Sequence, residues 1–108
     1  MQSNYKLRYL PVFYEDLNSS VLYIARKLKN PAAANKLVDS VEKAILQRLP
    51  DAESFEPYHS LKDRAYPYYR IYVDNYIIFY VVIDEGTDGR YMEVRRLLHV
   101  RQNRDSII

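Results

Sequence analysis

The sequence has no cysteine, two histidines and two glycines, and each shortage excludes a class of site. Without cysteine there is no disulfide scaffold, thiol nucleophile or cysteine zinc site. The histidines show no His-x-x-x-His spacing and no paired-aspartate motif is present, so we expect neither a metal nor another cofactor. Both glycines lie within residues 85–89, where they suit a turn, which excludes a glycine-rich phosphate loop. No serine lies in a nucleophile-elbow motif.

Long apolar segments are also missing. No hydrophobic run approaches the roughly 18 residues that a membrane-spanning helix needs. The first ten residues, MQSNYKLRYL, lack the apolar core and the small-residue cleavage site of a secretory signal. The sequence therefore predicts a cytoplasmic protein without a membrane partner.

The chain is short, rich in tyrosine and basic at its C-terminal end. The chain has 108 residues, so we expect residues 1–108 to form one domain. It contains 12 tyrosines against three phenylalanines and no tryptophan, and a tyrosine ring packs on one side while its hydroxyl hydrogen-bonds. Residues 90–108 hold five arginines against two carboxylates, although the net charge of the chain is only +2. This basic C-terminal end favours an acidic partner, either nucleic acid or an acidic peptide.

The first half of the chain has the spacing of one strand and two helices. Residues 4–10 alternate apolar and polar side chains, as a half-buried strand does. Residues 12–29 and 31–49 repeat apolar positions every three or four residues, which predicts two amphipathic helices separated at Asn30-Pro31, with Asn30 as N-cap. A short connection between them predicts an antiparallel helical hairpin. The apolar stripes expected in the core are Phe13, Leu17, Val21, Ile24 and Leu28 in the first helix, and Ala34, Leu37, Val41, Ala44 and Ile45 in the second.

The second half is rich in the residue types that favour strands. Residues 66–73, 76–83 and 91–98 are predicted strands, separated by turns at residues 74–75 and 85–89. The order β-α-α-β-β-β predicts an α+β fold, with a small antiparallel sheet packed on the helical hairpin. We expect the opposite face of the sheet to stay open to solvent or to a partner, and to carry the function. The tail at residues 100–108 fits either a brief helix or an extended segment.

Four stretches, in chain order, carry a resemblance to a known family. They are YKLRYLPVFYEDL, which includes Asp16-Leu17, then NPAAANKLVDSVEKAI, the strand pair RIYVDNYIIFYVV, and the closing VRRLLHVRQNRD. In these the chain resembles the RelE/ParE superfamily of toxins from bacterial type II toxin–antitoxin modules. The resemblance spans nearly the whole length, although no single motif has the specificity of a zinc or P-loop signature.

The resemblance implies a growth-inhibiting toxin of a plasmid-stabilisation or addiction module, neutralised by a cognate antitoxin whose acidic or amphipathic segment wraps around it. The superfamily divides by mechanism. RelE-like members cut messenger RNA on the ribosome, whereas ParE-like members interfere with DNA gyrase and lack ribonuclease activity. The expected target is therefore either gyrase or ribosome-bound messenger RNA.

Arg70 and His99 are the candidate catalytic residues if the chain is RelE-like. Arg70 lies between Tyr68 and Tyr72 on one strand face, where it can clamp a phosphate while the rings stack on bases. Packing of an exposed arginine on its tyrosines is the other interpretation. A histidine titrates near neutrality, as acid–base cleavage of RNA needs, and His99 follows Arg95 and Arg96 at a strand end. Alternatively, His99 only bonds to backbone.

The candidate target- or antitoxin-binding residues are basic or aromatic: Lys62, Arg64, Arg70, Tyr72, Arg95, Arg96 and Arg101. Arginine and tyrosine are enriched in binding hot spots. An acidic antitoxin tail is expected across the open sheet face or along the helical hairpin, with the arginines speeding its association.

Two departures from the RNA-cutting pattern favour the ParE-like branch. RNA-cutting relatives place an arginine just after the tyrosine that leads the second strand of the pair, whereas here Tyr76 is followed by Ile77. The C-terminal catalytic tyrosine of several relatives is also missing, since the tail reads QNRDSII. Action on gyrase is preferred. A RelE-like endoribonuclease and a degenerate, non-toxic antitoxin-binding module remain as alternatives.

Overall fold

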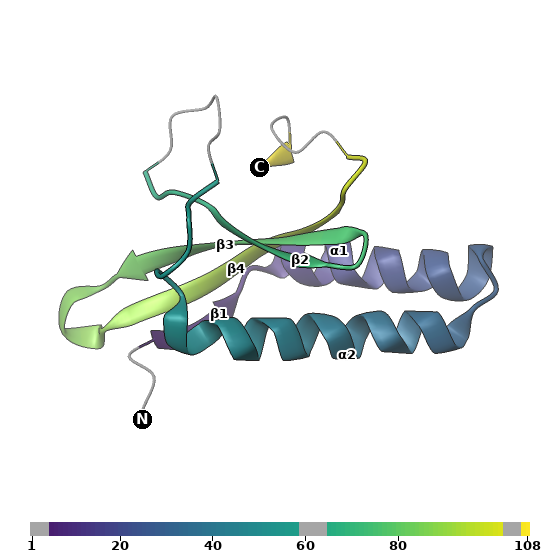
Figure 1. The fold of residues 1–108 in the computed structure, drawn as a ribbon, viewed down its shortest axis with the longest axis horizontal. Helices are drawn as coiled ribbons and strands as arrows, with labels where there is room; N and C mark the ends of the chain where they lie inside the picture. The colour runs from purple at the N-terminus through teal and green to yellow at the C-terminus, as the bar shows by residue number, and fades with distance from the viewer. Residues whose placement is uncertain (1–4, 59–64, 103–106) are drawn as a thin grey trace.

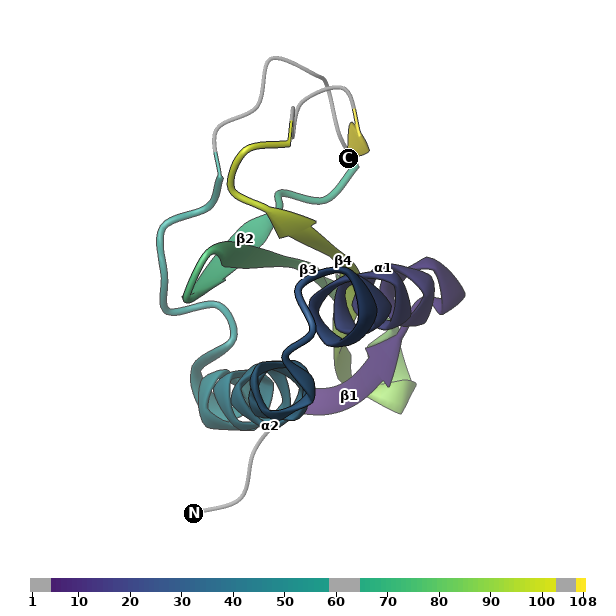
Figure 2. The same ribbon diagram turned by 90° about the vertical axis from the view of Figure 1, so that its right-hand side faces the viewer.

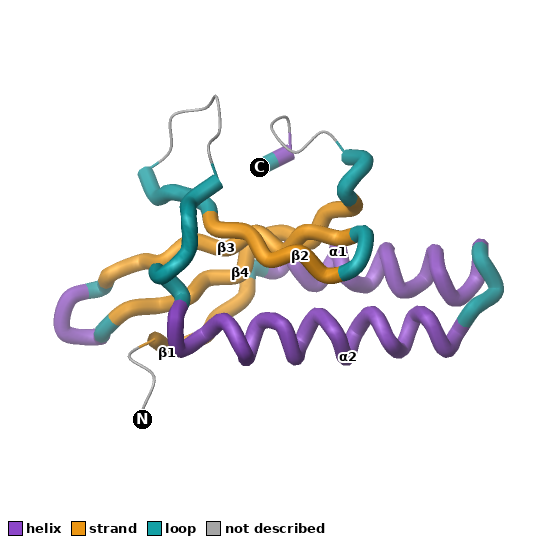
Figure 3. The backbone as a smooth tube through the Cα atoms, in the orientation of Figure 1, coloured by secondary structure: helices purple, strands orange, loops and turns teal. Residues whose placement is uncertain are grey.

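A computed structural model describes residues 5–58, 65–102 and 107–108. The elements follow in the order β1 (Tyr5–Tyr9), α1 (Pro11–Leu22), η1 (Tyr23–Lys27), α2 (Pro31–Arg48), η2 (Leu49–Asp51), β2 (Tyr69–Val73), β3 (Tyr76–Asp84), η3 (Gly86–Asp88) and β4 (Arg90–His99). Figures 1 and 3 show two long antiparallel helices beside a small sheet. The predicted α+β class and the β-α-α-β-β-β order are confirmed. Among the described residues, no helix is long and apolar enough to cross a membrane.

Local sequence signals set the bounds of the two helices. Pro11 occupies the first turn of α1, where its missing N–H costs no hydrogen bond. The second helix begins as predicted, because the Asn30 side chain accepts a hydrogen bond from the Ala33 N–H at 3.1 Å. The first helix departs from the prediction of one regular helix over residues 12–29. It widens after Leu22 into the π-helical turn η1, whose closing bond runs from the Leu28 N–H to the Tyr23 carbonyl.

The four strands form one sheet in the order β1-β4-β3-β2. β2, β3 and β4 make the predicted antiparallel meander. β1, however, pairs in parallel with β4, from Tyr5 opposite Arg90 to Tyr9 opposite Val94. The sheet is therefore mixed, not wholly antiparallel as expected, because the helical hairpin carries the chain across to the far edge as a crossover connection.

The main core lies between the sheet and the helices. The predicted stripe of α2 is buried at Ala34, Leu37, Val41 and Ile45. The last three of these pack in one cluster with strand residues such as Ile78 and Met92. The stripe of α1 is buried less completely, with Phe13 buried and Leu17 and Ile24 packed at the margin. Leu28, expected in the core, is 56% exposed. In Figure 1 the far end of the helical hairpin extends past the β2–β3 turn, so the sheet does not cover it.

A second core lies on the other face of the sheet, which the sequence had led us to expect open. Ile77, Phe79, Val81 and Leu98 have at most 1% of their surface exposed. They pack with Tyr68 and Ile108, and Tyr58 and Ile107 border the cluster. Figure 2 shows the chain before β2 and the C-terminus on the side of the sheet away from the helices. The expectation of an open face was wrong for this part of the sheet, because distant segments return to cover it.

Candidate functional site

Arg70 and Tyr72 lie on β2, an edge strand of the sheet. The Arg70 guanidinium lies over the rings of Tyr58 and Tyr72, with its carbon 5.1 Å and 5.8 Å from the two ring centroids. Tyr72 is 58% exposed. The structure therefore confirms Tyr72 as a neighbour of Arg70, but the second ring is that of Tyr58. Tyr68, which the sequence predicted there, is only 7% exposed and lies against the Arg95 guanidinium. Lys62 and Arg64 lie outside the described residues.

His99 ends β4, and a tight turn fixes its ring. The Arg101 N–H donates to Nδ1 of His99 at 3.2 Å, and the His99 N–H donates to the Gln102 side-chain oxygen at 2.7 Å. The ring meets the Tyr76 ring edge-on, with centroids 5.3 Å apart. These residues border a groove of about 550 Å³, here called the β4-end groove. It is lined by Ser19, Ser20, Tyr23, Tyr76, His99, Arg101 and Gln102.

Arg70 and His99 occupy opposite faces of the sheet. Arg70 pairs with Phe79, which belongs to the second core. His99 pairs with Tyr76, which packs against the main core on the helix side. Residues that pair directly share a face, and successive strand residues alternate between faces. The two candidate catalytic side chains are therefore separated by the sheet and do not converge on one phosphate.

Arg95 and Arg96 form ion pairs within the molecule. Arg95 donates to Glu93 at 2.8 Å, and the same buried carboxylate accepts from Arg8 at 2.9 Å. Arg96 donates to both carboxylate oxygens of Asp16, at 2.7 and 2.9 Å. This hydrogen bonding raises the pKa of Arg96 above its ordinary value. These two arginines thus stabilise the fold. The partner of Arg96 lies 80 positions away, beyond what local spacing indicates, whereas the partner of Arg95 is two residues away on the same strand.

Arg101 differs from the other arginines near the end of the sheet. It is exposed, and within the described part of the chain no carboxylate pairs with it. Arg90, by contrast, contacts Glu53 at 2.6 Å. Of the described arginines at this basic end, Arg101 is therefore the one that has no carboxylate partner among the described residues and can bind an external anion.

Ile77 has no exposed surface and lies in the second core with Leu98 and Ile108. The sequence singled out this position because RNA-cutting relatives carry an arginine there. In this chain the position is a packed apolar one, closed to solvent.

The sequence did not predict a groove on the helical hairpin. An apolar groove of about 320 Å³ lies between α1 and α2, and Tyr14 and Leu46 on its rim are about half exposed. It is lined by Tyr9, Phe13, Tyr14, Leu17, Val38, Val41, Glu42, Ile45 and Leu46, and is here called the hairpin groove. Burial raises the pKa of the Tyr9 hydroxyl. The sequence analysis assigns the apolar stripes of both helices to the core alone. The apolar residues Tyr14 and Leu46, which flank these stripes, are the sequence feature that indicates the groove.

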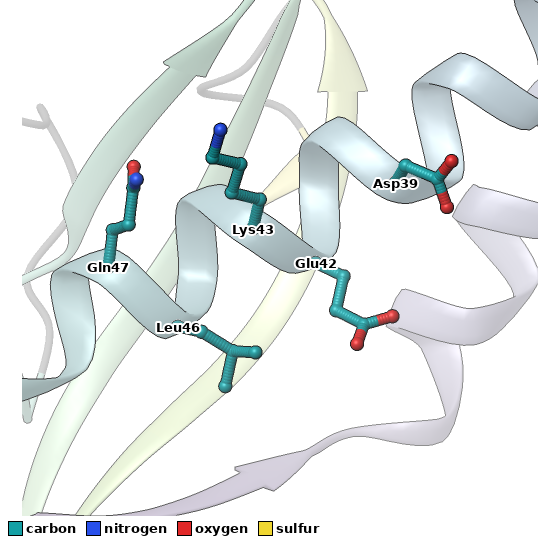
Figure 4. Close-up of a pocket in the computed structure, with 5 residues that line it drawn as sticks. All are labelled: Asp39, Glu42, Lys43, Leu46 and Gln47. Carbon is teal, nitrogen blue, oxygen red and sulfur yellow. The ribbon is translucent and has the colours of Figure 1, made fainter.

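A second hollow adjoins the hairpin groove on α2 and shares Glu42 and Leu46 with it. Figure 4 shows Glu42 and Leu46 on one side of the helix and Lys43 and Gln47 on the other. Leu46 thus shares its side of α2 with the acidic Glu42. No group of three or more histidine or carboxylate side chains suited to a metal occurs in residues 5–58, 65–102 and 107–108.

Comparison with known proteins agrees with this architecture. Residues 7–104 match the family model of the ParE toxin of the type II toxin–antitoxin system parDE. A comparison with curated proteins gives no match. Because the family model covers nearly the whole chain, with every described strand and helix wholly or partly inside it, this chain belongs to the ParE toxin family of type II toxin–antitoxin systems.

Proposed function

We propose that this toxin acts by binding DNA gyrase and does not cut messenger RNA. The observation that carries the proposal is the burial of Ile77, which occupies the position of an arginine in RNA-cutting relatives. Cleavage of RNA without a metal needs cations that stabilise the charge of the pentavalent phosphate. A buried aliphatic side chain supplies none, and a packed core excludes the RNA strand from this position.

The placement of Arg70 and His99 supports the same proposal. A general base or acid must come within hydrogen-bonding reach of the atom it serves, and the stabilising cation must reach the same phosphate. These two residues pair with Phe79 and Tyr76, which lie on opposite faces of the sheet. A single bound phosphate therefore cannot contact both.

The test uses purified toxin, purified gyrase and RNA from cells. We expect the toxin to stop DNA supercoiling by gyrase or to trap cleaved DNA, and we expect added cognate antitoxin to reverse the effect. After brief induction, primer extension on cellular transcripts is expected to show no new ends.

Two other results would overturn the proposal. Unaltered supercoiling and cleavage at a large excess of toxin, with transcript cuts between the second and third codon positions, would assign a RelE-like ribonuclease. If the toxin neither inhibits gyrase nor cuts transcripts, and the native host grows normally after induction, the chain is instead a degenerate module that binds antitoxin without toxicity.

The hairpin groove is the surface we propose for the cognate antitoxin, which the family implies as a partner. With part of the opposite sheet face closed, the groove offers an apolar trough of about 320 Å³ with exposed Tyr14 and Leu46. An amphipathic helix docks in such a trough through apolar side chains spaced by three or four residues. Glu42 at the rim suits a lysine or arginine of that helix.

Leu46→Glu is the variant that tests this docking site. Its side chain is half exposed, so the fold tolerates the change, while a charge placed in the apolar trough should weaken antitoxin binding about 30-fold or more, as loss of a hot-spot residue does. Asn35→Glu adds the same charge at an exposed position of α2 outside the groove and serves as the control. Equal affinities of the two variants, measured by calorimetry, would place the antitoxin elsewhere.

A further inference from the structure

The β4-end groove differs in chemistry from three other grooves in the described part of the chain. The hollow on α2 contains Asp39 and Glu42, the hairpin groove contains Glu42, and a groove between α2 and β2 contains Asp74. Among the described residues, those that line the β4-end groove include no carboxylate. They carry hydroxyl, amide, imidazole and guanidinium groups, most of which donate hydrogen bonds. This composition favours an anionic ligand.

Fixed hydrogen bonds in the terminal turn strengthen the donor character of this groove. Because Nδ1 of His99 accepts the Arg101 N–H, the proton of the neutral ring lies on Nε2, which becomes a donor. Because the Gln102 side-chain oxygen accepts the His99 N–H, the amide group of Gln102 retains its two N–H donors. Further bonds hold the turn, from the Val100 N–H to the Asn75 carbonyl and from the Gln102 N–H to the His99 carbonyl, both 2.9 Å. The donors are therefore preorganised.

The opposite wall of the groove comes from the junction of α1 and η1. The carbonyls of Ser19 and Ser20 accept a hydrogen bond from the Tyr23 N–H. Because these oxygens are already hydrogen-bonded, they repel an anion in the groove less than free carbonyls would. The π-helical turn begins at Tyr23, which lines the groove and is 53% exposed. An exposed aromatic ring next to anion-binding donors suits a base attached to a phosphate.

We propose that the β4-end groove binds a nucleoside phosphate, either as a free nucleotide or as part of a nucleic acid strand. Arg101, His99 and Gln102 contact the phosphate, and Tyr23 supplies a ring for the base. The volume of about 550 Å³ lies within the range of small-ligand sites. The site lies on the helix side of the sheet, away from Arg70, and it does not depend on whether gyrase is the target.

The experiment titrates the purified ¹⁵N-labelled chain with 5′-AMP at constant ionic strength, following amide signals by NMR. We expect the signals of Tyr23, Arg101 and Gln102 to shift, and adenosine, which lacks the phosphate, to shift them far less. Arg101→Gln should weaken binding about tenfold, because a charge-assisted hydrogen bond is lost. His99→Phe keeps a ring of similar shape but removes the Nε2 donor, and should also weaken binding.

Arg26→Gln is the matched control, since Arg26 is an exposed arginine of η1 outside the groove and the variant has the same net charge as Arg101→Gln. No shifts with millimolar 5′-AMP, equal shifts with adenosine, or equal weakening by the two arginine variants would each overturn the proposal. A single-stranded oligothymidylate, titrated in parallel, distinguishes the sources. Tighter binding of the oligonucleotide than of 5′-AMP assigns a nucleic acid strand, and the reverse order assigns a free nucleotide.

Discussion

At the scale of the residue, Asp16 shows how one side chain joins two elements. β1 pairs with β4 only as far as Val94, so the backbone of β4 beyond that residue lacks a strand neighbour on this edge. The Asp16 carboxylate, from α1, accepts from the Leu97 N–H at 3.0 Å and from Arg96 at two atoms. It thus satisfies a backbone donor at the point where α1 replaces β1 beside the sheet.

Asp16→Ala should therefore lower the free energy of unfolding by about 2–3 kcal/mol, because it leaves the Leu97 N–H and the Arg96 guanidinium without their acceptor. Asp16→Asn should cost less, since an amide oxygen still accepts one of these bonds. Urea denaturation measures both. Glu15→Ala, at an exposed position of the same helix, is the control and should cost no more than about 0.5 kcal/mol. A loss for Asp16→Ala as small as that of the control would show that this contact does not stabilise the fold.

At the scale of the element, the sequence was a good guide to what forms locally. The periods of α2, the Asn30 cap and the strands β2, β3 and β4 were predictable, because each depends on neighbours in the chain. The parallel pairing of β1 with β4 joins residues 85 positions apart, and the second core joins residues up to 50 positions apart. Periodicity does not encode contacts at such separations. The same limit applies to the site. Arg70 was correctly placed beside Tyr72, whereas Asp16, the partner of Arg96, lies 80 positions away and was not predictable.

The apolar stripes give an element-scale prediction about burial. Leu37, in the middle of α2, is 4% exposed, whereas Leu28, at the free end of the hairpin, is 56% exposed. Leu37→Ala should lower the free energy of unfolding by about 2–4 kcal/mol, since it leaves a cavity in the main core. Leu28→Ala should cost about 0.5 kcal/mol or less, as surface changes usually do. Thermal or urea denaturation of the two variants measures both changes. Equal losses of unfolding free energy would mean that the free end of the hairpin is packed as tightly as the middle of α2.

At the scale of the whole molecule, the tyrosines connect the core to its polar surroundings. Tyr80 is fully buried, yet its hydroxyl donates to the Ala52 carbonyl at 2.7 Å and accepts from Arg48 at 3.0 Å. Arg48 also donates to the Arg70 carbonyl on the edge strand and stacks on the Phe55 ring. One tyrosine therefore links the sheet, the second helix and the chain after it. This use of a ring with a polar end helps to explain a chain with 12 tyrosines and no tryptophan.

These buried hydroxyls predict a loss of stability in alkali. Burial raises the pKa of Tyr9, Tyr69 and Tyr80 above the ordinary value of 10.0. The folded state then holds its protons to higher pH than the unfolded state. The resulting stability is complete below the unfolded pKa near 10 and is lost as pH rises toward the raised folded pKa.

Urea unfolding should thus show lower stability at pH 11 than at pH 9. Tyr9→Phe should reduce that drop, whereas Tyr72→Phe, at an exposed ring, should not. The same drop in both variants would mean that buried tyrosines do not cause the alkaline sensitivity.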